Sequence, residues 1–294
     1  MTETLQILLN SVSAIGPILL IALAITSFMS ATRVLNAAVG SVVVISAFLG
    51  IWGDEHGGFA LSLICAIGSA VVLYLAMELL VLRPQRLRLA NVEMGSFAAT
   101  LGIATILSAA AAMATGGLTL SLPSASIRVN GILAVGGAAI PYISLIQFAC
   151  SVVLAVLLGL LLRRTSFGRR FRALSSNRPL AAAIGVDVNR MALLSALLGG
   201  ALTGLAAFLS LIEIRSLDVT SASDYLLIPF AAVVAGGLGS LRGTVIACCF
   251  FGIAETVAIT LIGKPGVQDI LVFGLLFVIL YVRPQGFESA TAAS

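Results

Sequence analysis

Residues 61–82 read LSLICAIGSAVVLYLAMELLVL, and Glu78 is the only charged residue among them. A helix needs about 20 apolar residues to cross the hydrocarbon core of a bilayer. Similar apolar runs recur along the chain, at residues 18–29, 42–51, 143–162, 191–212 and 267–282. The sequence therefore predicts a membrane protein that crosses the bilayer several times as helices.

The composition of the whole chain supports this prediction. Of its 294 residues, 60% are hydrophobic and 10% are charged, and the mean hydropathy is +1.16. A soluble domain carries about 25% charged residues. So few charges could not cover a water-exposed surface, so most of the surface must contact membrane lipid. We expect an all-α transmembrane bundle that forms a single domain over residues 1–294.

Two pairs of spanning segments are unusually close together. We expect eight or nine spanning or half-spanning segments, near residues 10–32, 34–52, 58–82, 95–117, 140–162, 191–212, 226–242, 244–262 and 267–283. The first two segments are short and tightly joined, as are 226–242 and 244–262. Broken helices are tolerated in membranes only where protein or water satisfies the free backbone groups. Such breaks often mark transport pathways, and similar breaks in both halves hint at a repeat.

Basic residues gather in three places, at residues 83–88, at residues 163–190 and at Arg283. Acidic loops, such as those at Asp54 and Asp218, alternate with them. Loops rich in Arg and Lys stay on the cytoplasmic side of a membrane. The three basic clusters and the C-terminus are therefore expected to be cytoplasmic. The segment at residues 116–141, rich in Ser, Gly, Pro and Ala, is expected to be an outer loop.

The basic loop at residues 163–190 reads RRTSFGRRFRALSSNRPLAAAIGVDVNR. Short helices interrupted near Pro179 and Gly185 could carry one apolar stripe, made of Leu174, Ala181, Ala182 and Ile184. A helix with an apolar stripe and a basic rim suits docking into a groove of another protein. A loop that only sets topology, or that rests on anionic lipid, explains the charge equally well. The residues alone leave both interpretations open.

Several blocks of sequence resemble one known family. The blocks are TSFGRRFRALSSNRPLAAAIGVDVNR with the following ALLSALLGGALTGLAAFL, LLIPFAAVVAGGLGSLRGTVIACCFFGIAETV, VRPQGF and VLRPQRLRLANVEMGSFAATLGIATIL. Together they resemble the permeases of branched-chain amino acid ABC transporters of the Liv type. The match runs from about Ala22 to Phe287, with its blocks in the family's order.

The resemblance implies a function and a set of partners. The chain would be a permease subunit of an ABC importer in the bacterial inner membrane, for branched-chain or related small amino acids, amides or carboxylates. Its partners would be cytoplasmic ATPases, a second related permease and a periplasmic substrate-binding protein. The resemblance also favours the basic loop as the ATPase docking site, through Phe171, Leu174, Ala181, Ala182, Ile184 and Gly185.

The sequence departs from the family after its first span. Family members carry Asn-Phe-Ala-His-Gly, whereas this chain has Asn36-Ala-Ala-Val-Gly40. The departure leaves the substrate open. Asn36 and Gly40 are nevertheless a polar residue and a glycine in an apolar setting, where irregular backbone is tolerated only beside protein or water. We expect them to line or shape the substrate pathway.

Two carboxylates fall within apolar runs. Glu255 lies in the middle of its run, where an ionisable residue is costly and is usually functional or paired. We expect it to be buried in the bundle, either as a structural hydrogen-bonding group or as part of the pathway or its gate. Glu78 lies near the end of its run, so we expect it to reach the membrane surface and assign it no role.

Other functions are disfavoured by what the sequence lacks. It has no GxxxxGK[ST] motif, so any ATP would be bound by partner ATPase subunits, and we expect no cofactor in this chain. The lone His56 and the four cysteines in apolar runs give no metal site. No cluster of His, Cys, Asp or Glu falls within a span, which argues against a membrane enzyme, and no nucleic-acid partner is expected. An ion-coupled secondary transporter or a channel is the alternative class.

Overall fold

The computed structural model describes residues 2–88, 92–122, 131–135, 137–262, 267–283 and 286–287. Its helices are α1 (Thr2–Thr32), α2 (Val39–Ala76), the π-helix η1 (Met77–Leu82), α3 (Arg83–Arg88), α4 (Val92–Thr115), α5 (Tyr142–Arg164), α6 (Ser166–Ser176), α7 (Arg178–Ala183), α8 (Val188–Ile214), α9 (Ser221–Gly236), α10 (Leu241–Ile262) and α11 (Val267–Val282). Its short strands are β1 (Leu120–Ser121), β2 (Ile132–Val135), β3 (Ala138–Pro141) and β4 (Ser216–Leu217).

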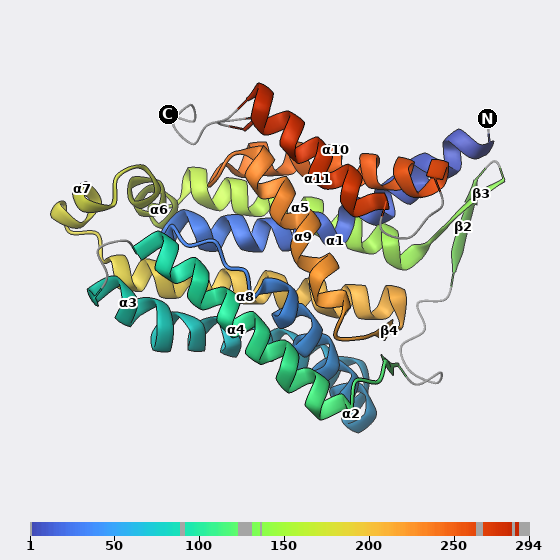
Figure 1. The fold of residues 1–294 in the computed structure, drawn as a ribbon, viewed down its shortest axis with the longest axis horizontal. Helices are drawn as coiled ribbons and strands as arrows, with labels where there is room; N and C mark the ends of the chain where they lie inside the picture. Colours follow the sequence, from blue (N-terminus) through green and yellow to red (C-terminus); the bar gives the residue numbers. More distant parts are fainter. Residues whose placement is uncertain are drawn as a thin grey trace.

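The long helices run roughly side by side along the longest axis of the molecule (Figure 1). In the part of the chain that the structure describes, six helical stretches are long and apolar enough to cross a membrane, and α9 and α11 are shorter apolar helices. The predicted polytopic all-α fold is confirmed. Helices α1 and α8 are buried over most of their apolar length and form the centre, whereas most of α4 and α5 faces outward.

The two ends of the molecule, whose elements are seen in Figure 1, carry different charged residues. At one end lie α3, α6, α7 and the last residues of α1. We call this the basic end, since it carries Arg33, Arg83, Arg86 and the loop at residues 163–190. The opposite end holds the N-terminus and the four short strands, and we call it the acidic end because Glu213 and Asp218 flank β4 there.

Helix α2 folds back on itself at Gly58, whose φ of 68° and ψ of −160° are not helical. The two legs, residues 39–57 and 59–76, lie against each other. A Cβ added to Gly53 would lie 3.0 Å from the Cα of Ser62, and one added to Gly50 would lie 3.5 Å from the Cβ of Ala66. A straight helix rises about 1.5 Å per residue and would hold these pairs far apart. The legs match the predicted spans 34–52 and 58–82, although the first begins only at Val39.

The predicted break after the first span lies at residues 33–38, between α1 and α2. The N–H of Ala37 donates to Oγ1 of Thr100 at 3.2 Å, and Thr100 in turn donates to the carbonyl of Leu35 at 3.3 Å. Thr100 is about two turns inside α4, which begins at Val92 at the basic end. This non-helical backbone therefore packs against the apolar helix α4, whose Thr100 supplies hydrogen bonds that a helix would otherwise supply.

The second half of the bundle repeats this plan in the opposite direction. Helices α1 and α8 both end at an arginine in the left-handed region, Arg33 (φ 55°) and Arg215 (φ 63°). A non-helical stretch and a new helix follow each arginine, α2 in one case and α9 in the other. The order α1, two legs of α2 and α4 corresponds to α8, α9, α10 and α11, with every helix reversed (Figure 1). The hint of a repeat in the sequence is thus an inverted repeat in the structure.

The two new helices meet at their first turns. Gly40 and Ala222 are each the second residue of their helix, and a Cβ on Gly40 would lie 1.9 Å from the carbonyl oxygen of Ala222. Only a residue without a side chain fits this contact. The inverted halves therefore join through backbone contact between the first turns of α2 and α9.

The second predicted break separates α9 from α10. Gly237 and Gly239 have φ values of 101° and 88°, and the carbonyl of Ala235 accepts a 2.8 Å hydrogen bond from the N–H of Phe287. Helix α9 begins at residue 221 rather than near the predicted 226.

The predicted outer loop, residues 116–141, lies at the acidic end where the structure describes it (Figure 1). Strand β1 pairs with β4, and β2 pairs with β3 as a hairpin. Gln6 of α1 accepts from the N–H of Ala139 at 2.9 Å and donates to its carbonyl at 3.0 Å. Residues 123–130 lie outside the described residues.

Candidate functional site

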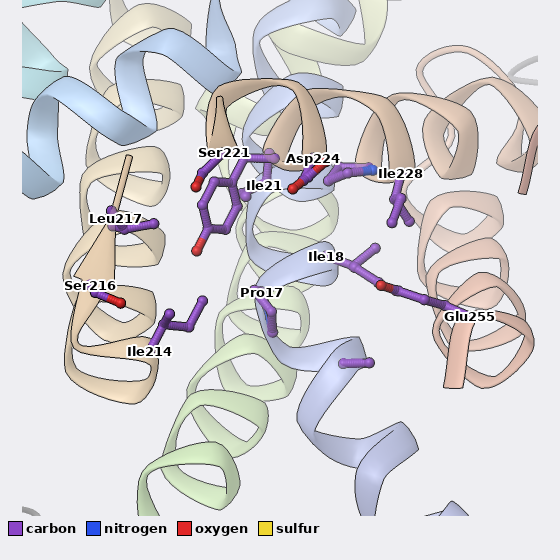
Figure 2. A pocket seen from close by; sticks show the side chains of 13 residues that line it. Pro17, Ile18, Ile21, Ile214, Ser216, Leu217, Ser221, Asp224, Ile228 and Glu255 are labelled. Atoms are coloured by element: carbon purple, nitrogen blue, oxygen red, sulfur yellow. The ribbon is translucent and has the colours of Figure 1, made fainter. Parts of the chain in front are cut away.

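A pocket of about 250 Å³ lies between α1, α9, α10 and the segment that joins α8 to α9. Its lining residues are Ala14, Pro17, Ile18, Ile21, Ile214, Ser216, Leu217, Ser221, Asp224, Tyr225, Ile228, Pro229 and Glu255. Figure 2 shows Ser221 and Asp224 projecting from α9, and Glu255 reaching toward Ile18 of α1. The pocket thus lies where the inverted halves meet, a common position for a transport site.

The lining combines an apolar surface with a few polar groups. Among the described residues, Asp224 and Glu255 are the two carboxylates that line it, and none of its described lining residues is Arg or Lys. Ser216 and Ser221 add hydroxyl groups. Binding sites for small molecules have this composition, with mostly apolar walls and a small number of placed polar groups. Since carboxylates accept hydrogen bonds, the pocket suits a small ligand that presents N–H or O–H donors.

Two prolines shape the walls. Pro17 lies inside α1 and Pro229 lies inside α9, and both line the pocket. A proline within a helix removes one backbone hydrogen bond and clashes with the preceding turn. Each wall is therefore locally interrupted beside the pocket, where a loosened helix can bend.

Asp218 fixes the start of α9 beside the pocket. Its Oδ1 accepts from Thr220 Oγ1 at 2.7 Å, and from the backbone N–H and the hydroxyl of Ser221, each at 2.9 Å. These bonds, that from the Thr220 hydroxyl foremost, lower the pKa of the Asp218 carboxyl. The charged carboxylate therefore holds the turn that presents Ser221 to the pocket.

Glu213 ties the neighbouring helices together. Its carboxylate accepts from Ser13 of α1 at 2.6 Å and from Ser144 of α5 at 2.5 Å. Since Glu213 precedes Ile214 and Ser216, these bonds fix the end of α8 that lines the pocket.

The three predicted pathway residues do not share one cavity. Glu255 lines the pocket and is half-buried there, where we expected a carboxylate buried in the bundle. The cavity itself exposes this side chain. Gly40 packs against Ala222, directly behind the α9 wall. Asn36 is 2% exposed in the break before α2, and its Oδ1 accepts from the N–H of Ala38 at 3.0 Å. Their roles in transport stay predictions.

The basic loop forms two helices that end near the predicted interruptions. Asn177 Oδ1 accepts from the N–H of Leu180 at 3.1 Å and caps α7, and Gly185 follows α7 with a φ of 88°. In contrast, the prediction of a single apolar face is wrong. Phe171, Leu174 and Ala181 are buried in a cluster with Ala31 of α1 and Met191 of α8. The amphipathic helix α6 turns its apolar side toward the bundle, because burial there removes more apolar surface from water.

The rest of the loop remains exposed. Leu180 and Ile184 are 61% and 69% exposed, and Ala182 and Gly185 are exposed beside them. In Figure 1, α7 lies at the outermost part of the basic end. The predicted docking residues thus divide into three that anchor the loop and three that face outward.

Glu78 is a feature that the sequence interpretation missed. It is buried within the protein rather than exposed: it is 1% exposed and pairs with Arg86 at 2.5 Å across the π-helix η1. An unpaired charge would be strongly disfavoured there, so the wide turn of η1 places the carboxylate where Arg86 can reach it. The sequence signal for this pair was an arginine eight residues after a glutamate at the end of a span.

Among the described residues, no three His, Cys, Asp or Glu side chains gather in a metal-binding arrangement. What the structure does contain is a bundle with broken helices, an inverted repeat and, where the halves meet, a mostly apolar pocket with a few polar groups. These features define a polytopic membrane transport protein.

The chain belongs to the family described as branched-chain amino acid transport system / permease component, which it matches over residues 7–280. It is similar to the high-affinity branched-chain amino acid transport system permease protein LivH of Escherichia coli K12, with 24% identity over 96% of this chain and 94% of that protein. It is 27% identical to the permease protein BraD of Pseudomonas aeruginosa over 54% of this chain and 51% of the relative.

The family includes permeases for other compounds. The chain is 32% identical to the ribose import permease protein RbsC of Bacillus subtilis over 45% of this chain and 42% of that protein. Its alignments with BraD and RbsC thus span about half the length of these relatives or less. Membership identifies a transport permease component in a membrane and leaves the substrate open.

Proposed function

We propose that this chain is a membrane-spanning subunit of an ABC importer for branched-chain or related small amino acids, amides or carboxylates. The match to the permease family over residues 7–280 carries the proposal. The near full-length alignment with LivH favours an amino acid over a sugar. The pocket, with apolar walls and two carboxylates, accommodates the side chain and the ammonium group of a small amino acid.

In this proposal the basic end faces the cytoplasm, because loops rich in arginine are retained on that side. The C-terminus would then be cytoplasmic as well, since Phe287 bonds to Ala235 near the end of α9. The acidic end would face the periplasm of a bacterial inner membrane and receive substrate from a binding protein. A second related permease would complete the membrane unit, and ATP would be bound by partner ATPases rather than by this chain.

The ATPase would dock on the exposed part of the basic loop, residues Leu180, Ala182, Ile184 and Gly185. Exposed apolar side chains outside the lipid region fit a partner groove. Phe171, Leu174 and Ala181 would instead anchor the loop to α1 and α8, so that force applied to the loop reaches the bundle.

Co-purification tests this proposal. The tagged chain, expressed in its host, should retain an ATPase subunit through purification in mild detergent. The double substitution Ala182→Glu and Ile184→Glu should abolish this retention, because it buries unpaired charge at the interface. The matched control Arg169→Glu and Arg170→Glu changes more charge on exposed positions of α6 and should weaken retention less. Equal retention by the Ala182/Ile184 variant and the unchanged protein would show that the loop is not the docking site.

A further inference from the structure

Arg33 links the basic loop to the break between α1 and α2. Its backbone lies in the left-handed region, with φ 55°, and its N–H donates to the carbonyl of Met29 at 2.7 Å. Arginine rarely adopts this conformation, which glycine and asparagine favour. Its side chain leaves α1 and reaches α6, where Nη2 donates to the carbonyl oxygens of Ser175 at 3.0 Å and Ser176 at 3.1 Å.

These bonds cap the end of α6. The last carbonyls of a helix have no partners within the helix, and the partial negative charge at this end attracts a cation. The same turn of α1 contacts α6 through apolar groups as well, since Ala31 packs in one cluster with Phe171 and Leu174. Helix α6 is therefore held to the end of α1 by both a charged and an apolar contact.

Arg33 is the first of the non-helical residues 33–38 between α1 and α2. Side chains hold these peptide groups: Thr100 bonds to Leu35 and Ala37, and Asn36 bonds to Ala38. A segment without helical backbone hydrogen bonds can shift while few backbone hydrogen bonds break. It leads to Gly40, which touches Ala222, the neighbour of the pocket residue Ser221.

We propose that Arg33 transmits movement of α6 through residues 33–38 to the α9 wall of the pocket. This inference rests on the proposed function, in which a partner ATPase moves the α6–α7 loop. Contiguous packed and hydrogen-bonded groups can carry such coupling, and the contacts from α6 to Ser221 are contiguous. Arg33 does not line the pocket, so it is a positioning residue rather than a binding residue.

The test compares pocket accessibility with ATP turnover in the same complex. The four native cysteines are replaced by serine, and Ser221→Cys reports on the pocket. The complex with its ATPases is placed in lipid nanodiscs, and the rate of maleimide labelling is measured without nucleotide and after trapping with ATP and vanadate. Trapping should change the rate in the parent about fivefold or more, a typical size for coupling between two sites.

The decisive variants are Arg33→Gln, which removes the charge, and Arg33→Asn, which removes the long side chain but favours the left-handed backbone. In both, the response to trapping should fall below about twofold, a loss of most of the coupling. ATPase co-purification and ATP hydrolysis should stay at the parent level. Arg170→Gln, the same change at an exposed arginine of α6, should behave like the parent. Arg33→Lys should retain part of the response.

Two results would overturn the inference. One is a full labelling response in both Arg33→Gln and Arg33→Asn. The other is loss of ATPase co-purification in these variants, which would make Arg33 a docking residue. A parent complex that retains no ATPase would contradict the proposed function itself, and the inference with it. That failure appears before any Arg33 variant is compared, so the two failures are distinguishable.

Discussion

Gly40 and Gly102 provide a matched test of how closely α2 approaches α9. A Cβ on Gly40 would meet the carbonyl of Ala222 at 1.9 Å, whereas one on Gly102 of α4 would meet nothing within 4 Å. Gly40→Ala should lower the free energy of unfolding by about 1–3 kcal/mol, the usual cost of overpacking. Gly102→Ala should be neutral or stabilising by roughly 0.5–1 kcal/mol, because glycine weakens a helix.

Thermal unfolding of the two variants in detergent measures this difference. Equal melting temperatures would show that the halves are not in backbone contact at Gly40.

Glu255 tests whether the pocket binds substrate. Glu255→Gln keeps a hydrogen-bonding group of similar size, whereas Glu255→Leu replaces it with an apolar one. A hydrogen bond to a charged group contributes about 1.5–3 kcal/mol, so Glu255→Leu should reduce uptake about tenfold or more at equal expression. Glu255→Gln should reduce it less. Unchanged uptake by both variants would exclude Glu255 from binding.

At the residue scale, the sequence identified the notable residues better than it predicted the burial and contacts of their side chains. Asn36 and Gly40 were identifiable because a polar residue and a glycine are conspicuous in an apolar run, and they lie in the break before α2 and at the contact with α9. The exposure of Glu255 depends on a cavity between four separate segments, which local sequence does not encode. The burial of Glu78 depends on Arg86 reaching it across a π-helix, a backbone form without a sequence signature here.

At the scale of elements, the ion pair between Glu78 and Arg86 connects η1, which continues α2, to α3. Breaking a buried pair leaves an uncompensated charge and costs about 3–5 kcal/mol. Glu78→Leu or Arg86→Met alone should therefore lower stability by this amount. The double variant should lose less than either single variant, because no charge remains buried. Unfolding of the four proteins in one detergent gives the coupling directly. Additive losses would mean that the pair does not interact.

In the basic loop, the apolar residues were identified correctly from the sequence, but the surfaces that they contact were not. Its short helices and their interruptions are visible in the sequence. Phe171 and Leu174 lie on α6, whereas Ala182 lies on α7 and Ile184 directly follows it. The pattern could not show that the first pair faces the bundle and the second pair faces outward. That choice is made by Ala31 and Met191, which come from α1 and α8.

At the scale of the whole molecule, orientation in the membrane follows from the two charged ends. Cysteines introduced at Ser176 of α6 and at Thr220 before α9 are exposed at opposite ends. In intact cells of a strain with a permeable outer membrane, an impermeant maleimide should label Thr220→Cys and leave Ser176→Cys unlabelled until the cells are opened. The reverse pattern would place the basic end in the periplasm and contradict the proposed docking site.

The fold as a whole was largely predictable, because a long apolar run in lipid satisfies its backbone hydrogen bonds by forming a helix. The breaks at residues 33–38 and 237–240 were also indicated by the close spacing of segments. The inverted repeat was only hinted at. Its recurring features are backbone events, such as the left-handed Arg33 and Arg215, and the helices that they end have different sequences. The inverted repeat is recognised from the directions in which the helices run, and residue identity does not specify these directions.

In the proposed function, this chain moves a small solute with energy that a partner takes from ATP. The most direct measurement is accumulation in proteoliposomes that contain the co-purified complex, with the binding protein outside. A mixture of branched-chain amino acids, short amides and carboxylates is supplied, and the accumulated compound is identified by mass spectrometry. We predict accumulation that requires ATP inside and disappears with Ala182→Glu and Ile184→Glu. Accumulation driven by an ion gradient, without ATP or an ATPase, would contradict this function.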